Sequence, residues 1–317
     1  MLNSIQYADI LQKELDQQIM VEATSSWMDE NAGEVIYNGG ATIKIPTIST
    51  DGLADYDRDN GFPQGAVTLT HESYTMTQDR ARTFMLDAMD VNESNFLVNA
   101  AHVSSVFQRE HVIPEIDAYR YSKEAALAKA AGRMFGGTII TAENIYGMLL
   151  DDLAAIQDVV GDIQLVITMS VLTGALLNQS KELSRHLSLV DFTRGEIQSK
   201  VKGIDNNPIL TVPSARFKTE YVFRDETAGG GFAPTEDAKT IMWTIRPRSL
   251  PIGLCKTDKL RIFEPDVNQK ADAWKIDYRK YHDLIIKKNQ MDSMLVRINE
   301  TVTTEKEDDS NGDETGI

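Results

Sequence analysis

Two stretches whose side chains alternate between two faces, joined by a charged and aromatic turn, restrict the possible folds of this sequence most. Residues 41–45 and 67–77 alternate as half-exposed β-strands do, and the turn-rich residues 49–65 between them include Tyr56 and Phe62. Both faces of the second stretch carry polar side chains, so neither face suits an apolar core. Because an isolated two-stranded ribbon is only marginally stable in water, such an arm needs further contacts. The pattern predicts an arm that lies across a neighbouring subunit, in a chain built for assembly.

The composition excludes several classes of protein. A chain of 317 residues suffices for one elaborate domain or two ordinary ones, and its net charge of −16 argues against wrapping nucleic acid. Because Cys255 is the single cysteine, neither an intrachain disulfide nor a cysteine-based metal site is expected. The first residues lack a basic and apolar pattern, and no run reaches about 18 apolar residues, so we expect neither a secretory signal nor a membrane span. The sequence predicts a soluble protein made in a reducing cytosol.

Helical spacing of apolar residues dominates the first half of the chain. The expected helices cover residues 4–28, 92–130, 141–158 and 171–178, the last with Ser170 as its N-terminal cap. Pro114 should interrupt the second helix, which then restarts, and Gly136 with Gly137 should end it.

Strand signals dominate most of the second half. A buried strand is expected at residues 163–169, and further strands at 187–192, 197–204, 209–212, 240–246 and 259–263. Residues 278–287 and 294–298 should form a final pair around a polar turn. A helix-rich middle between strand-rich ends indicates an α+β fold. Residues 299–317 are acidic with almost nothing apolar, which predicts a disordered tail.

The candidate sites for chemistry each lack an essential residue. Residues 55–61 begin like an EF-hand calcium loop, but Asn60 replaces its glycine and Ala66 stands where a glutamate belongs. The glycines at 229–231 are not followed by the Lys-Ser/Thr pair of a phosphate loop. The histidines are scattered, and none neighbours Cys255. We therefore predict that the chain is not an enzyme and has no catalytic, cofactor-binding or metal-binding residue.

A run of alternating charges follows the ribbon, with Asp79, Arg80, Arg82, Asp87 and Asp90 as its main members. Such a run can be an ordinary solvated face, since exposed ion pairs contribute only about 0–1 kcal/mol each. At a repeated interface the same charges set register and select partners, and arginine pairs with carboxylates through two hydrogen bonds. We favour the interface because the adjoining ribbon already requires a partner.

These segments together resemble a known family. The resemblance is carried by residues 37–40 (Tyr-Asn-Gly-Gly), 44–46 (Lys-Ile-Pro), 55–61, 78–80 (Gln-Asp-Arg), 87–93, 107–109 (Phe-Gln-Arg) and 114–120. In combination and order they resemble the major capsid proteins of tailed double-stranded DNA bacteriophages, which have the Hong Kong 97-type fold. The similarity is closest to a branch from phages of Gram-positive bacteria. It extends to about residue 298 and is strongest over residues 37–123.

The resemblance implies a division of the chain into regions. These are an N-terminal arm (1–33), an extended loop (34–80), a peripheral domain with a long spine helix (81–139), an axial domain (140–255), return strands (256–298) and the acidic tail (299–317). The extended loop of the family lies over an adjacent subunit, in agreement with the unpartnered ribbon. Eleven residues are the expected intersubunit contacts: Tyr56, Asp57, Arg58, Asp59, Phe62, Asp79, Arg80, Arg82, Asp87, Asp90 and Arg120.

The resemblance also implies a function. Hexamers and pentamers of one sequence would form an icosahedral shell, the capsid of a virion, around double-stranded DNA that is held without sequence-specific binding. The chain would be made in the host cytoplasm, with a separate scaffolding protein, a portal protein at one vertex, no membrane partner and no covalent crosslink. The acidic balance would keep packaged DNA from adhering to the inner wall. An encapsulin-type nanocompartment shell is the alternative. A soluble α+β enzyme with an unrecognised site is the rival hypothesis from a different functional class.

Overall fold

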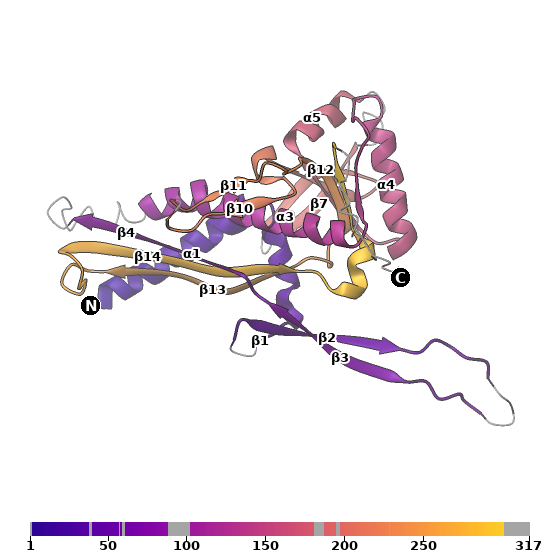
Figure 1. The fold of residues 1–317 in the computed structure, drawn as a ribbon, viewed down its shortest axis with the longest axis horizontal. Coiled ribbons are helices and arrows are strands. Elements are labelled where there is room, and N and C mark those ends of the chain that lie inside the picture. Colours follow the sequence, from indigo (N-terminus) through magenta and orange to yellow (C-terminus); the bar gives the residue numbers. More distant parts are fainter. Residues whose placement is uncertain are drawn as a thin grey trace, which may run out of the picture.

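The computed structural model describes residues 2–37, 40–56, 58, 61–87, 102–180, 187–194, 197–227 and 229–300. It has the predicted α+β architecture. Figure 1 shows a layer of long strands, a wedge of helices and strands above it, and one hairpin that projects away from both.

The helical elements range from long α-helices to single turns. They are α1 (Leu2–Glu22), the 3₁₀ helix η1 (Ser26–Glu34), the π-helical turn η2 (Gln108–Val112), α3 (Ile113–Ala130), α4 (Ile145–Val160), α5 (Val171–Gln179), and the 3₁₀ turns η4 (Ser214–Arg216) and η5 (Lys288–Ser293). Ser170 caps α5 as predicted, because its hydroxyl accepts a hydrogen bond from the Thr173 amide at 3.0 Å.

A seven-stranded sheet forms the core of the wedge. Its strands, in spatial order, are β5 (Met134–Phe135), β15 (Leu295–Ile298), β12 (Ile241–Pro247), β6 (Leu165–Ser170), β9 (Asn207–Val212), β8 (Ile197–Ile204) and β7 (Leu187–Arg194). Every residue of β6 is buried, as its run of branched side chains predicts. Leu149 and Leu153 on α4 pack against Ile167 of β6 and Ile245 of β12.

The layer of long strands is a three-stranded antiparallel sheet in the order β13 (Ile252–Phe263), β14 (Ala273–Ile285) and β4 (Gln78–Asp87). Its inner face is apolar, because Leu260, Ile276 and Tyr278 pack against Leu11 and Leu15 of α1. Alternate residues point to the opposite, outer face, where most side chains are at least partly exposed. A two-stranded sheet of β10 (Tyr221–Phe223) and β11 (Phe232–Pro234) lies near α3 in Figure 1.

The predicted ribbon is present as β2 (Thr42–Thr50) and β3 (Val67–Thr75), with the short β1 (Ile36–Tyr37) beside β2. Residues 42–50 pair in antiparallel register with residues 67–75. The body resumes at Gln78, where β4 begins and pairs with β14.

The prediction of a final strand pair was wrong. Residues 278–287 belong largely to β14, which lies between β13 and β4, whereas β15 pairs with β12 and β5 of the other sheet. The turn η5 carries the chain from one sheet to the other instead of closing a hairpin. Alternation in sequence identifies a strand but does not identify its partner.

Two helix boundaries also differ from the prediction. The interruption predicted at Pro114 is present as a π-helical turn, in which Ile113 donates to the carbonyl of Gln108, and α3 then begins with Pro114 in its first turn. Helical structure is otherwise continuous from residue 102 to Ala130. It ends at Gly132, not at Gly136 and Gly137: Gly132 has a φ of 68°, and the amide of Arg133 donates to the carbonyl of Ala128 at 2.8 Å. The first helix ends at Glu22 and continues as the separate η1. The predicted start at residue 92 and the tail beyond residue 300 lie outside the described residues.

Candidate assembly surfaces

The root of the β2–β3 hairpin is anchored in an apolar cluster. Ile43 and Ile45 of β2 are fully buried, together with Met76, against Leu254 of β13 and Ile285 of β14. These side chains attach the hairpin to the strand layer, so its direction is set by the body of the subunit.

The distal half of the hairpin is exposed on both faces. Ile48 is 67% exposed, Val67 72%, and Leu53 in the connecting loop is completely exposed. Figure 1 shows this part extending away from the body. Such apolar side chains, held in water without a covering layer, indicate a surface that a partner covers.

The described residues towards the tip of the hairpin contact one another. Asp51 donates its amide to the carbonyl of Ala66 at 3.2 Å and accepts from the Ala66 amide through Oδ2 at 2.7 Å. The rings of Tyr56 and Phe62 meet edge to face, with centroids 5.2 Å apart, and both are exposed. Arg58 is exposed as well, while Asp57 and Asp59 lie outside the described residues.

A buried polar network clamps the hairpin where it joins β4. The amide of Thr77 donates to Asp283 Oδ2 at 3.1 Å, and its hydroxyl is 2.9 Å from the hydroxyl of Tyr119 on α3. Tyr119 donates to Asp283 at 2.8 Å, and Lys123 of the same helix forms an ion pair with Asp283. The helix α3 therefore positions the hairpin root directly.

His282 of β14 lies in the same region, opposite Gln78 in the sheet register. It is 2% exposed, and its Nδ1 has no hydrogen-bond partner among the described residues. Burial lowers the pKa of the imidazole well below its usual range, and the nearby cations lower it further: Arg120, Lys280, Lys123 and Arg80. His282 is consequently neutral at pH 7.

Acid should therefore destabilise the subunit from about pH 6.5 downward. Below that pH the unfolded chain binds a proton at His282 that the folded chain does not, so this residue lowers the free energy of unfolding by up to about 1.4 kcal/mol per pH unit. Between pH 7.5 and 5.0 the native subunit should lose roughly 2 kcal/mol more than the His282→Gln variant does, measured by urea unfolding. His102→Gln, at an exposed position, serves as the control. Equal pH dependence of the native chain and His282→Gln would contradict this assignment.

The charges on β4 have partners within the chain. Asp79 and Arg279 form an ion pair at 2.5 Å on the outer face, and this contact lowers the pKa of the Asp79 carboxyl. Arg80 donates to Glu115 of α3 at 2.6 Å and to the carbonyls of Arg224 and Gly231. Arg80 thus connects β4, α3 and the β10–β11 loop within one subunit.

Two other predicted contacts of this run also lie on β4. Arg82 and Asp87 are exposed, and Asp90 lies outside the described residues. They stay candidates for intersubunit contact, together with Tyr56, Arg58 and Phe62.

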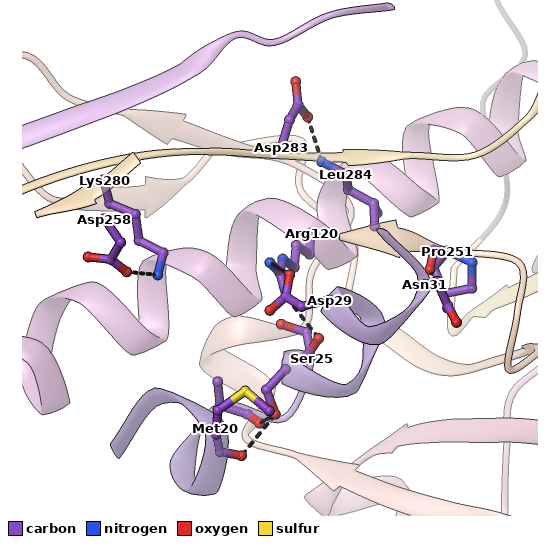
Figure 2. Close-up of polar contacts among 12 residues, drawn as sticks. Met20, Ser25, Asp29, Asn31, Arg120, Pro251, Asp258, Lys280, Asp283 and Leu284 are labelled. Carbon is purple, nitrogen blue, oxygen red and sulfur yellow. Dashed lines mark hydrogen bonds and ion pairs between the residues drawn. The ribbon is translucent and has the colours of Figure 1, made fainter. Parts of the chain in front are cut away.

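Arg120 requires a correction, because it is only 1% exposed. Figure 2 shows its guanidinium beside Asp29, 3.2 Å from Asp29 Oδ2, and it also donates to the carbonyl of Ser25 at 2.9 Å. A side chain paired this way inside its own subunit cannot reach a neighbour. Arg120 instead holds η1 against α3.

Sequence reasoning missed a buried charged stripe on α3, formed by Asp117, Arg120 and Glu124. Asp117 accepts hydrogen bonds from the amides of Thr24 and Ser25, from the Ser25 hydroxyl and from Arg216. Glu124 and Arg246 of β12 form an ion pair at 3.0 Å in which neither side chain is exposed. The available signal was their spacing of three and four residues, which places all three on one helix face.

Neither a metal centre nor a membrane span is visible in the described part of the chain. Within those ranges, no three histidine, cysteine, aspartate or glutamate side chains lie close enough to hold a metal ion. None of the described helices combines the length and apolar character needed to cross a bilayer.

Comparisons with known proteins identify the fold. No family model matches the sequence, and no curated protein matches it either. Among solved structures, the mature capsid of bacteriophage PhiM1 shares 11% identity over 84% of this chain and 85% of its own, with a TM-score of 0.56. The capsid of cyanophage P-SCSP1u shares 10% identity over 84% and 85%, with a TM-score of 0.55. The holo-SrpI encapsulin complex of Synechococcus elongatus shares 12% identity over 83% and 84%, with a TM-score of 0.50. The α+β chain with its projecting hairpin therefore has the Hong Kong 97-type fold.

Proposed function

We propose that the chain is the major capsid protein of a tailed double-stranded DNA phage, from the branch that infects Gram-positive bacteria. Copies of it assemble as hexamers and pentamers into an icosahedral shell, the capsid of the virion. The subunits are made in the host cytoplasm before they assemble.

The projecting hairpin is the observation that carries this proposal. Its root is buried in the strand layer, yet its distal half presents Ile48, Leu53, Val67 and Leu69 to solvent. At about 25 cal/mol per Å² of apolar surface, covering four such side chains stabilises an assembly by several kcal/mol in total. A heterologous contact, in which the hairpin of one copy lies on a different surface of the next, closes into rings as a shell requires.

The same proposal assigns partners. The chain binds copies of itself, a separate scaffolding protein during assembly and a portal protein at one vertex. It encloses DNA without reading its sequence, in keeping with a net charge of −16 that disfavours adhesion to phosphates. Tyr56, Arg58, Phe62, Arg82 and Asp87 are the described residues that we assign to contacts between copies, and Asp57, Asp59 and Asp90 join them from outside the described ranges.

An encapsulin-type shell is the second candidate, favoured by the similarity in fold to the holo-SrpI encapsulin complex. Such a shell would use the same hairpin contacts but enclose protein cargo instead of a genome.

Electron microscopy of the purified protein tests the proposal. Expressed with the structural genes that accompany it, the chain should form closed icosahedral particles, and nuclease-protected DNA should be recovered from particles that have packaged a genome. A co-purifying enzyme inside the particles, with no DNA, would favour the encapsulin-type shell. Monomers that form no particles under any of these conditions would overturn both candidates.

A further inference from the structure

The outer face of the β13–β14–β4 sheet carries a cleft of about 320 Å³ with several charged side chains among its lining residues. Four cations are among its lining residues, Arg82 of β4, Lys259 and Arg261 of β13 and Arg279 of β14, together with Thr83 and Thr257. No large apolar side chain among its lining residues is strongly exposed. The cleft therefore suits a charged and polar ligand.

Two of these cations carry charge that the described residues do not neutralise. Arg279 is paired with Asp79, and the one acid that lines the cleft, Asp277, is 2.9 Å from Lys275 and accepts from Thr83 at 2.7 Å. Lys259 and Arg261 are exposed and have no ion-pair partner in the described part of the chain. In a chain with a net charge of −16, two adjacent unpaired cations on one sheet face attract an anion.

The chain itself contains a segment of matching charge and spacing. Residues 305–314 include six acids and one lysine, and Glu305, Glu307 and Asp309 occupy alternate positions. In an extended peptide, alternate side chains repeat on one side at roughly 6.8 Å. Lys259 and Arg261 are also alternate residues of one strand and follow the same repeat.

From this match we infer that the cleft binds the acidic segment 301–317 of a copy of this chain, with Lys259 and Arg261 against the carboxylates of Glu305, Glu307 and Asp309. The cations of the cleft favour this segment over the hairpin tip, where Arg58 stands among the aspartates and the exposed Leu53 and Phe62 require an apolar surface. The inference is independent of shell assembly, because the contact can form between or within free subunits.

Carbodiimide coupling of the full-length chain tests the contact, because the reagent joins an amine to a carboxylate only at ion-pair distance. Mass spectrometry should identify amide links from Lys259 to Glu305, Glu307 or Asp309. Links from Lys259 to the aspartates of residues 51–59 would assign the cleft to the hairpin and overturn the inference. The absence of any link at Lys259 would overturn it as well.

Acetylation of Lys259 in a matched pair of variants tests whether the alternate spacing of Glu305, Glu307 and Asp309 matters. Acetylation of Lys259 should be about threefold slower than that of the exposed Lys200 of β8 at low salt, and the difference should vanish in 0.5 M NaCl, where charges are screened. The triple variant Glu305→Gln, Glu307→Gln and Asp309→Asn should remove the protection. The variant Asp308→Asn, Asp313→Asn and Glu314→Gln, which loses the same charge elsewhere in the segment, should retain it. Equal effects of both variants would show non-specific attraction and contradict the predicted register.

Discussion

Arg246→Met is expected to lower the free energy of unfolding by about 3–5 kcal/mol, because it leaves the carboxylate of Glu124 buried without its partner. Neither side chain of this pair is exposed, and Arg246 also donates to Thr168 and lies 5.4 Å from the ring of Trp27. Burial already raises the pKa of the Glu124 carboxyl, while Arg246 opposes that rise. Urea unfolding of the subunit at pH 7.5 measures the loss.

The double variant Glu124→Met with Arg246→Met is the control. Two apolar side chains of similar length remove the unpaired charge, so the double variant should be clearly more stable than Arg246→Met. Because Glu124 in the single variant can relieve its burial by binding a proton, Arg246→Met should lose less stability than the native chain does as the pH falls towards 5. A single variant that loses less than about 1 kcal/mol would show that this pair does not hold α3 to β12.

Shortening the hairpin should abolish shell formation while the subunit still folds. Thr50 and Val67 are the last paired residues of β2 and β3, so an Asn-Gly turn in place of residues 51–66 closes the ribbon in its native register. The anchor residues Ile43, Ile45 and Met76 are unchanged, and circular dichroism and thermal unfolding should therefore resemble those of the native chain. Negative-stain microscopy and sedimentation should detect free subunits or small oligomers and no closed particles.

A second variant tests whether assembly needs only the length of the hairpin or also the side chains of its loop. Residues 51–66 are replaced by a Gly-Ser segment of the same length, which keeps the span but removes Leu53, Tyr56 and Phe62. If these side chains make the contact, this variant should fail to assemble as well. Normal shells from the shortened variant would refute the interface role of the hairpin.

The elements that local pattern controls were predictable from the sequence. The ribbon, the buried strand β6 and the Ser170 cap all follow from periodicity or capping within a few residues of sequence. The interruption expected at Pro114 takes the form of a π-helical turn just before it, after which α3 begins with the proline in its first turn. Local rules for proline do not include that adjustment.

The partners of the charged residues within the chain could not be predicted from the sequence. Arg80 and Arg120 were expected at contacts between copies, yet Arg80 pairs with Glu115 and Arg120 with Asp29 in the same subunit. These pairs join residues 35 and 91 positions apart. Whether a charge is buried depends on which elements pack over it, and single-sequence patterns do not contain that information.

The sequence by itself determined that this protein is an α+β chain with a ribbon too polar to be buried in a core of its own. Alternation and helical spacing are properties of neighbouring residues, so they can be read without a fold. Only the tertiary structure decided that β14 and β15 belong to different sheets, that α3 clamps the root of the hairpin and that Lys259 and Arg261 share an open cleft. Those outcomes depend on contacts between distant segments, whose energies arise only once water is excluded between them.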